Sequence, residues 1–317
     1  MKTIILSLLA ASTLSTTIAS AQTPRDASQS SIVMSRVASP SVPRKVTFAD
    51  QTYDLDRVDL YERLDRELTA MSYTHGSTLL MLKRANRYFP EIIPILKRQG
   101  VPEDLIYLCC IESSLNPRAY SSAKAAGLWQ FMPSTAKQYG LEVNEYVDER
   151  YNLELATEAA CRMLKQLHRQ YGNWESAAAA YNGGPARITR ELGSQMSKSA
   201  LDLYLVEETQ RYMFRILAAK LIMNDPRLYG FTLQPDQFYT PMSYTTVKVS
   251  TPVESWPQWA ADHGITYAQL RDANPWIRDK TLPNKTGKTY TVKIPTKDSL
   301  LRSTADKTIY NPKWTTR

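Results

Sequence analysis

The sequence predicts a mainly α-helical domain followed by a small β-α-α-β module. Over residues 55–225, apolar side chains recur at helical spacing between residues that start and stop helices. After Gly230, two segments rich in β-branched residues, TTVKV and TYTVKIP, enclose two short helical stretches. The 317 residues, of which 43% are hydrophobic, suffice for one large or two modest domains with a core.

The N-terminal segment is expected to direct export to the periplasm or cell envelope. Residues 1–21 combine one early positive charge, the apolar run IILSLLAA and the small-residue ending ASA. This pattern is typical of a secretory signal peptide, cleaved before Gln22, and the run is too short for a membrane anchor. No cysteine follows the run, which argues against a lipoprotein anchor. Residues 22–54, rich in Ser, Pro, Thr and Arg, are predicted to form a linker or arm.

The helical domain is predicted to span residues 55–235. The segments DRVDLYERLDRELTAM and STLLMLKRANRYFPEIIPILKRQG come first, and Gly100 ends the second of them. The next helix lies in PEDLIYLCCIESS. Pro102 suits its first turn, and Asn116-Pro117 is expected to stop it because the residue before proline avoids the α region.

Further helices follow a polar loop, LNPRAYSSAKAAG. Ser134 is the expected cap of a short helix in STAKQYG. The clearest helix spans 152–172, and Asn173 and Gly183 are expected to cap and stop the one after it. A last long helix, in VEETQRYMFRILAAKLIMN, should break before Pro226.

Composition narrows the possible partners. The formal net charge of +8 favours an anionic partner such as cell wall, membrane surface or nucleic acid, although an ordinary solvated surface also accounts for it. No basic run resembles a nucleic-acid-binding arm, so nucleic acid is not expected. In an oxidising compartment, one of Cys109 and Cys110 could bridge to Cys161, or all three could be buried thiols.

The sequence contains no motif for a zinc site, a phosphate-binding loop or a serine hydrolase. The three histidines, at positions 75, 168 and 263, are far apart, and no Cys/His spacing fits zinc. No glycine-rich phosphate loop follows a strand, and the Gly-x-Ser-x-Gly elbow of serine hydrolases is missing. We therefore expect neither a metal nor a cofactor.

Glu112 is the candidate catalytic residue. At about 100° per residue it shares a helical stripe with Leu105, Leu108 and Cys109, so it points toward the core. Burial disfavours the charged form of a carboxylate and raises its pKa toward values useful for proton donation. Such an acid is what glycosidic bond cleavage requires at the leaving oxygen. A glutamate in a structural ion pair would show the same pattern.

The residues around Glu112 carry a family resemblance. The segments ESSLNPRAYSSAKAAGLWQFMPSTAKQYGL, AAAYNGG and EETQRYMFRILAAKLI occur in this order. Together they resemble the catalytic domain of lytic transglycosylases, particularly of the membrane-bound lytic transglycosylase D type, over residues 75–230. The resemblance implies a goose-type lysozyme-like α+β fold. It also implies cleavage of the β-1,4 bond between N-acetylmuramic acid and N-acetylglucosamine in peptidoglycan.

The resemblance also implies roles for single residues. Glu112 would be the acid/base, and Tyr181 would be catalytic, as the tyrosine that hydrogen-bonds near the glutamate. The expected substrate-binding residues are Ser121, Gln130, Met132, Asn182 and Tyr212. One departure is Lys124, where the family often has glycine or asparagine. If that turn needs a positive φ, lysine strains it and could reshape the loop.

The second domain resembles a LysM module, a β-α-α-β binder of N-acetylglucosamine chains, over residues 243–296. Leu270, Leu282 and Gly287 fit its pattern, as do Asn274-Pro275 and Ile294-Pro295. The usual Gly-Asp after the first strand is replaced by TPVES, which leaves glycan binding open. Residues 297–317 are expected to be a polar tail.

The expected reaction is that of a lytic transglycosylase with one carboxylate. Glu112 would protonate the glycosidic oxygen and then deprotonate the muramyl C6 hydroxyl, so that a 1,6-anhydromuramyl end forms without net use of water. Two alternatives remain. One is a hydrolytic muramidase with a second carboxylate from Glu142, Glu145, Asp148 or Glu149. The other is a non-catalytic peptidoglycan-binding protein.

Overall fold

A computed structural model describes residues 38–49 and 51–315 of the chain. The expected signal peptide, residues 1–21, and the first part of the expected linker lie outside the described residues. Within the described ranges, none of the helices combines the length and apolar character needed to cross a membrane.

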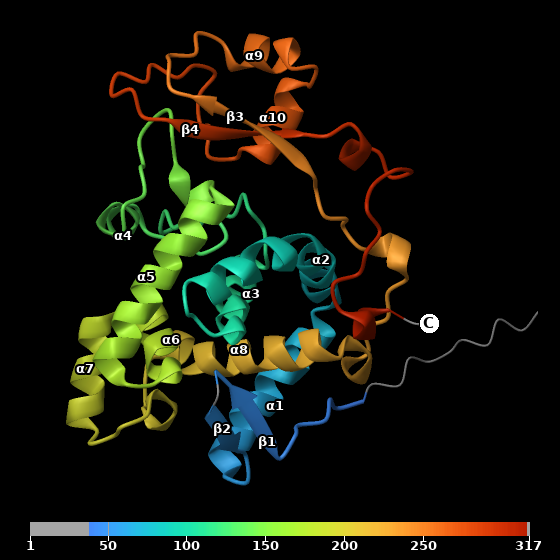
Figure 1. The fold of residues 1–317 in the computed structure, drawn as a ribbon. Coiled ribbons are helices and arrows are strands. Elements are labelled where there is room, and N and C mark those ends of the chain that lie inside the picture. The colour runs from blue at the N-terminus through green and yellow to red at the C-terminus, as the bar shows by residue number, and fades with distance from the viewer. Residues whose placement is uncertain (1–37, 50, 316–317) are drawn as a thin grey trace, which may run out of the picture. The chain divides into compact units, whose positions relative to one another are not determined.

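The helical domain is built around a core of long helices (Figure 1). Its helices are α1 (Val58–Tyr73), α2 (His75–Arg98), α3 (Ile106–Ser113), α4 (Pro133–Gln138), α5 (Leu153–Tyr171), α6 (Trp174–Gly183), α7 (Pro185–Ser194) and α8 (Glu207–Asn224). Helix α8 packs against α1, α3 and α6, and α5 packs against α2 and α6. The short helix α3 lies against α8, and its side chains from Ile106 to Cys110 are buried.

Side-chain capping explains where two of these eight helices, α5 and α6, begin. Asn152 and Asn173 accept hydrogen bonds from the backbone N–H groups of Leu155 and Ser176, as their sequence positions predict. The prediction for Ser134 is wrong. Helix α4 begins at Pro133, whose fixed φ suits the first helical position, and no side chain caps it.

The segment expected to be a linker contains an ordered strand pair. Strands β1 (Lys45–Phe48) and β2 (Gln51–Asp54) pair antiparallel, with Val46 opposite Tyr53. The side chain of Phe48 is fully buried in the core of the helical domain. The structure thus differs from the expectation, because alternate residues of a strand can bury an apolar face even in a polar segment.

The C-terminal tail also returns to the helical domain. Trp314 is 1% exposed, packs against Phe89 and Phe238, and donates its indole N–H to the carbonyl oxygen of Met223. The expectation of a polar tail over 297–317 missed this residue. One buried tryptophan contributes enough apolar area to hold a segment that is otherwise polar.

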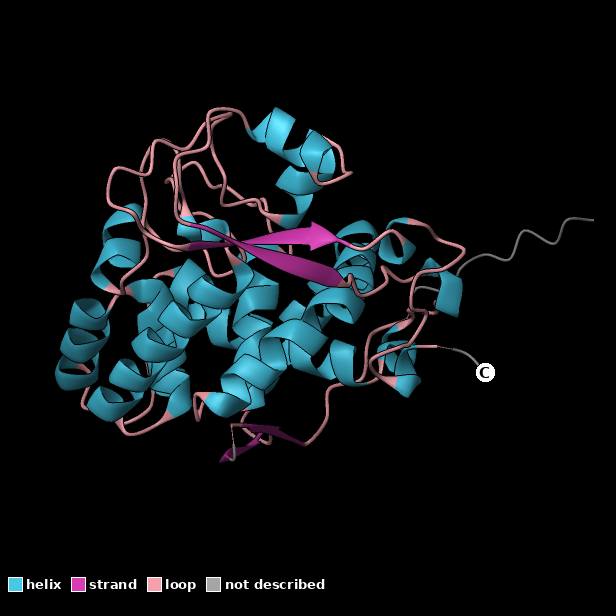
Figure 2. Cartoon of the chain, turned by 45° about the horizontal axis from the view of Figure 1, so that its top comes forward, coloured by secondary structure: helices cyan, strands magenta, loops and turns pink. Residues whose placement is uncertain are grey.

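The module consists of β3 (Tyr244–Val249), α9 (Trp256–Asp262), α10 (Tyr267–Ala273) and β4 (Tyr290–Pro295), in the predicted β-α-α-β order (Figure 2). The two strands pair antiparallel, with Val247 opposite Val292. Thr266 and Gln269 form a capping box at the start of α10. Its core is lined by Trp256, Leu270, Trp276, Ile277 and Val292.

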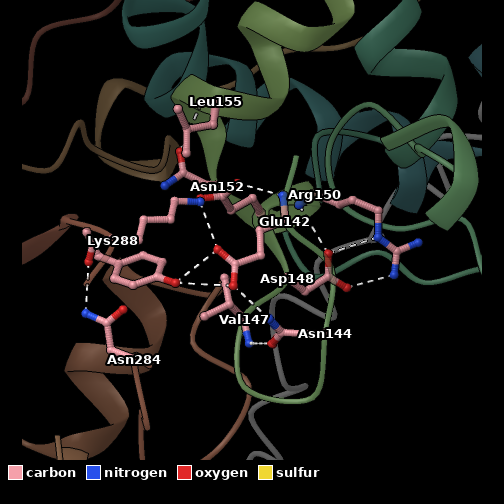
Figure 3. Close-up of polar contacts among 11 residues, drawn as sticks. Glu142, Asn144, Val147, Asp148, Arg150, Asn152, Leu155, Asn284 and Lys288 are labelled. Carbon is pink, nitrogen blue, oxygen red and sulfur yellow. Dashed lines mark hydrogen bonds and ion pairs between the residues drawn. The ribbon is translucent and has the colours of Figure 1, made fainter. Parts of the chain in front are cut away.

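Polar contacts join the module to the helical domain. Val147 and Ile277 form an antiparallel bridge, and the N–H of Asp148 donates to the carbonyl of Trp276 at 2.9 Å. Figure 3 shows Lys288 reaching Glu142, to which its ammonium group lies at 2.8 Å. The module is therefore attached through backbone pairing as well as through charges.

Candidate active site

Glu112 lies in the last turn of α3, where the helix is stopped by its own cap. Ser114 and Leu115 have φ values of +49° and +55°, and the N–H of Ser114 donates to Cys110 at 2.9 Å. The helix therefore ends at Ser113, before the Asn116-Pro117 pair that was expected to stop it. The left-handed turn is unusual for residues other than glycine and leaves the carboxyl group of Glu112 at the end of a buried helix.

A tyrosine from a distant helix holds this carboxyl group. The hydroxyl of Tyr212, on α8, donates to Oε1 of Glu112 at 2.6 Å. Burial raises the pKa of Glu112 to about 7, while the Tyr212 hydrogen bond and the charge of Arg215 lower it and that of Glu208 raises it. At neutral pH the group is thus divided between its acid and base forms, as an acid/base catalyst requires.

Both candidate tyrosines lie near Glu112, but they donate to different acceptors. Tyr212, expected to bind substrate, is 2% exposed and contacts Glu112 directly. Tyr181, on α6, donates to the backbone carbonyl of Trp129 at 2.7 Å. Burial and the nearby Glu112 charge raise the pKa of Tyr181, so it remains a hydroxyl donor close to the acid.

The remaining candidate residues lie around one loop and one helix end. The hydroxyl of Ser121 accepts from the N–H of Ala125 at 3.0 Å, and the amide of Gln130 donates to the carbonyl of Gly127 at 2.8 Å. Met132 is 41% exposed. Asn182, at the end of α6, has no side-chain hydrogen bond to any residue that the structure describes. Met132 and Asn182 therefore have side chains that can meet a substrate without breaking an internal bond.

Lys124 occupies the strained position that the sequence suggested. Its φ is +69°, in the left-handed region, where a side chain adds roughly 1–2 kcal/mol. Its N–H donates to the carbonyl of Ser121 at 2.9 Å, which closes the turn. The loop therefore keeps a tight turn with lysine in place.

Arg150 clamps this loop, a role that no sequence motif indicated. Its guanidinium is 5% exposed and Nη1 donates to the carbonyls of Lys124, at 2.7 Å, and Phe131, at 3.0 Å. Asp148 accepts from its Nε and Nη2 at 2.9 and 2.7 Å, which neutralises the charge (Figure 3). Gly127 packs so tightly that a Cβ there would lie 1.9 Å from the carbonyl oxygen of Arg150. Both ends of the loop that carries Gln130 are thus fixed to one buried cation.

The four carboxylates proposed as a second catalytic acid are occupied elsewhere or exposed. Glu142 and Glu149 both pair with Lys288, and Asp148 pairs with Arg150. Glu145 lies on the exposed turn before Tyr146. None of them has a recorded contact with Glu112 among the described residues.

The cysteines and candidate metal ligands give no further site. Cys109, Cys110 and Cys161 are buried free thiols, and burial raises the pKa of each. Unreactive packing thiols are therefore the better of the two interpretations of these residues. Within residues 38–49 and 51–315, no group of His, Cys, Asp and Glu side chains could hold a metal ion.

Two segments of the chain match known families. Residues 90–203 match the transglycosylase SLT domain, and residues 245–298 match the soluble lytic transglycosylase C-terminal LysM-like domain. The chain therefore contains both domains, which confirms the expected pairing of a lysozyme-like helical domain with a LysM-like module.

Parts of the chain are also similar to individual proteins. The membrane-bound lytic murein transglycosylase D of Escherichia coli K12 is 31% identical over 226 residues, which cover 70% of this chain and 48% of that protein. The soluble lytic murein transglycosylase of the same strain is 29% identical over 120 residues, 34% of this chain and 18% of that protein. A solved structure of the 70 kDa soluble lytic transglycosylase from Escherichia coli has a TM-score of 0.38 at 19% identity, over 54% of this chain and 31% of that chain. The chain spans about half the length of the first of these relatives.

Proposed function

We propose that this chain, which carries a transglycosylase SLT domain and a LysM-like domain, is a peptidoglycan lytic transglycosylase. It cleaves the β-1,4 bond between N-acetylmuramic acid and N-acetylglucosamine and leaves 1,6-anhydromuramyl ends. The observation that carries the proposal is Glu112, a partly buried carboxyl group with a pKa raised to about 7 by burial, held by a hydrogen bond from Tyr212 rather than from a cation.

In the first step, protonated Glu112 gives its proton to the glycosidic oxygen as the bond to the anomeric carbon breaks. The oxygen of the muramyl N-acetyl group bonds to that carbon as the glycosidic bond breaks. Tyr181, partly buried close to the acid, donates to this acetamide group in place of the Trp129 carbonyl. Tyr212 keeps Glu112 oriented and donates to the carboxylate once the proton has left. The single carboxyl group thereby becomes the base for the next step.

In the second step, ionised Glu112 accepts the proton of the muramyl C6 hydroxyl. The C6 oxygen then bonds to the anomeric carbon, the bond between that carbon and the acetamide oxygen breaks, and Glu112 regains the proton that it lost. No water enters the products, so no second carboxylate is needed to activate one. The pairing of Glu142, Asp148 and Glu149 with lysine or arginine supports this route over hydrolysis.

The proposal also assigns residues that bind the glycan. Met132 and Asn182 present unengaged side chains, whereas Ser121 and Gln130 first shape the loop and offer their remaining hydrogen-bonding capacity to the glycan. The proposed partner is the peptidoglycan strand, and the proposed location is the periplasm or cell envelope after export. No cofactor or nucleic acid takes part.

The test is mass spectrometry of muropeptides released from purified sacculi by the purified protein. Anhydromuramyl ends are the expected product. Reducing muramyl ends would replace the proposal with a hydrolytic muramidase. Sacculus binding without release would replace it with a non-catalytic binding protein.

A further inference from the structure

The LysM-like module binds one segment of the helical domain through its backbone. This segment, residues 142–150, lies between α4 and α5. Val147 forms an antiparallel bridge with Ile277 of the module, and both side chains are buried. A hydrogen bond flanks the bridge on each side, because the N–H of Asp148 donates to the module at 2.9 Å and the N–H of Arg278 donates to the segment at 2.9 Å. The pairing is that of a short antiparallel sheet, which fixes the segment against the module.

Side chains hold the two ends of the same segment. Lys288 of the module lies 2.8 Å from Glu142 and 2.6 Å from Glu149. The next residue is Arg150, the buried arginine that clamps the loop of the candidate active site. Figure 3 shows Lys288 on one side of the segment and the guanidinium of Arg150 on the other. The segment therefore lies between the module and the clamp.

Asp148 connects these two sides. Its N–H donates to the module, and its carboxylate accepts from Arg150 at 2.9 and 2.7 Å. Arg150 in turn donates to the carbonyl groups of Lys124 and Phe131. Both carbonyl groups belong to the loop of residues 114–132, which joins α3 to α4. A continuous series of hydrogen bonds thus runs from the module to this loop.

The loop also contacts the module directly. Ala126 is fully buried and belongs to the same apolar cluster as Val147 and Ile277. Arg118, near the start of the loop, forms an ion pair with Asp272 on α10 of the module. The loop is therefore held against the module at two points in addition to the Arg150 clamp.

Three of the residues proposed to bind the glycan, Ser121, Gln130 and Met132, lie on this loop. The N–H of Ala126 donates to the carbonyl of Phe131 at 3.1 Å, so the residue packed against the module also holds the stretch next to Gln130 and Met132. The places of these side chains consequently depend on the contact with the module.

Resting on the proposed function, we propose that the module is a positioning part of the active site. It holds the loop of residues 114–132 in the conformation that binds the glycan, and this role requires no glycan bound to the module itself. The acid lies on other elements, since Glu112 on α3 is bonded to Tyr212 on α8. Loosening the contact should therefore weaken glycan binding and leave the proton chemistry of Glu112 in place.

The ion pair between loop and module gives the first test. Both side chains are exposed, so their replacement leaves both cores intact. Asp272→Arg or Arg118→Asp puts like charges together. Each should raise amide hydrogen exchange in the loop, and KM on soluble glycan strands, about threefold. The double variant, Arg118→Asp with Asp272→Arg, restores an ion pair and should return both quantities to the wild-type values. Wild-type exchange in both single variants would overturn the proposal.

Asp262→Arg is the matched control. Asp262 is an exposed acid of the module, at the end of α9, and accepts a hydrogen bond from Gln258 of its own helix. The variant makes the same change of charge as Asp272→Arg and should leave loop exchange and KM unchanged. An equal rise of KM in the two variants would assign the effect to the net charge of the module and overturn the positioning role.

Ile277→Ala tests the paired segment from the side of the module. It removes apolar contact with Val147 and should raise exchange in the loop about tenfold and KM by a similar factor. The pH at which kcat falls should stay as in the wild type, because the bond between Glu112 and Tyr212 is intact. Exchange in β3 and β4 shows whether the module stays folded. Unchanged loop exchange, with the module folded or unfolded, would overturn the proposal, as would a shifted pH profile at unchanged KM.

Hydrogen exchange requires no turnover, so it separates this inference from the proposed function. A loop that loosens in Asp272→Arg and Ile277→Ala, in a protein whose wild type releases no product, would keep the positioning role and overturn the function. Turnover by the wild type, with an equally protected loop in these variants, would keep the function and overturn the positioning role.

Discussion

The active site and the contact between module and helical domain both bury carboxyl groups, and they stabilise them in opposite ways. Glu112 is held by a hydroxyl group, and burial raises its pKa. Glu142 is also partly buried, but hydrogen bonds from Lys288 and Tyr290 outweigh burial and lower its pKa. Lys288 adds a full positive charge and favours the charged form of Glu142, whereas the Tyr212 hydrogen bond lowers the pKa of Glu112 by less than burial raises it. The presence of a bonded lysine therefore distinguishes Glu142, which joins two parts of the molecule, from Glu112, which can exchange a proton.

The largest expected effect is on turnover. Glu112→Gln removes the proton donor and should lower kcat on sacculi by at least about a thousandfold, within the range known for lost acid/base groups. Glu142→Gln makes the same chemical change in the other region and should keep kcat within a few-fold of wild type. The rate at which each variant releases muropeptides from sacculi measures this difference. Comparable losses of kcat in the two variants would contradict the distinction between Glu112 and Glu142.

The next effect concerns the loop clamp. Arg150→Ala leaves Asp148 buried without its cation and two carbonyls without their donor, so the free energy of unfolding should fall by about 3–5 kcal/mol. Denaturant unfolding measures this loss. Arg187→Ala, at an exposed arginine on α7, is the control and should change stability by less than about 0.5 kcal/mol. An unchanged midpoint for Arg150→Ala would mean that the clamp is not formed.

The proton on Glu112 should also govern stability. Its pKa is raised from 4.5 in the unfolded chain to about 7 in the folded protein, so its favourable contribution is complete below pH 4.5 and is lost as pH rises through 7. At pH 8 the buried charge then destabilises the fold by up to about 3 kcal/mol, at about 1.4 kcal/mol per pKa unit.

Glu112→Gln removes this penalty. The variant should be more stable than wild type at pH 8 and no more stable at pH 4.5, as read from denaturant midpoints at the two pH values. The same stability difference at both pH values would show that Glu112 does not titrate near neutrality.

The two tyrosines should affect activity in different ways. Tyr212→Phe removes the hydrogen bond that lowers the pKa of Glu112, so the loss of kcat/KM at alkaline pH should move to higher pH. Tyr181→Phe removes a donor to the Trp129 carbonyl and should lower kcat by about tenfold. It should leave the pH at which kcat/KM is lost on the alkaline side unchanged. Complete pH–rate profiles distinguish them. A shift caused by Tyr181→Phe alone would reverse the two roles.

The smallest expected effect is at the module contact. Lys288→Ala removes the common partner of Glu142 and Glu149, and stability should fall by about 1–2 kcal/mol, since the lysine is partly solvated. Lys285→Ala, at a lysine of the same loop with no ion pair among the described residues, should have almost no effect. Thermal unfolding in low salt measures both. Equal values would mean that the remaining contacts hold the module without Lys288.

The sequence by itself determined the order of the helices, the β-α-α-β module and the buried position of Glu112. These features depend on neighbours a few residues apart, such as the caps at Asn152 and Asn173 and the apolar stripe of α3. Hydrogen bonds of that range are encoded locally, so spacing and residue type suffice to predict them. Ser134 was the exception, because the proline before it starts α4 without a side-chain cap.

Only the tertiary structure decided which residues meet. Tyr212 reaches Glu112 across 100 positions of sequence, Arg150 reaches Lys124 across 26, and Trp314 joins a core whose other members precede it by up to 268 residues (314 − 46 for Val46). Such contacts follow from how whole helices pack. The family resemblance selected Tyr212 as a site residue, but no local pattern predicted its hydrogen bond to Glu112. The acid could therefore be found from its own helix, while the groups that tune it could be found only once α8 was packed against α3.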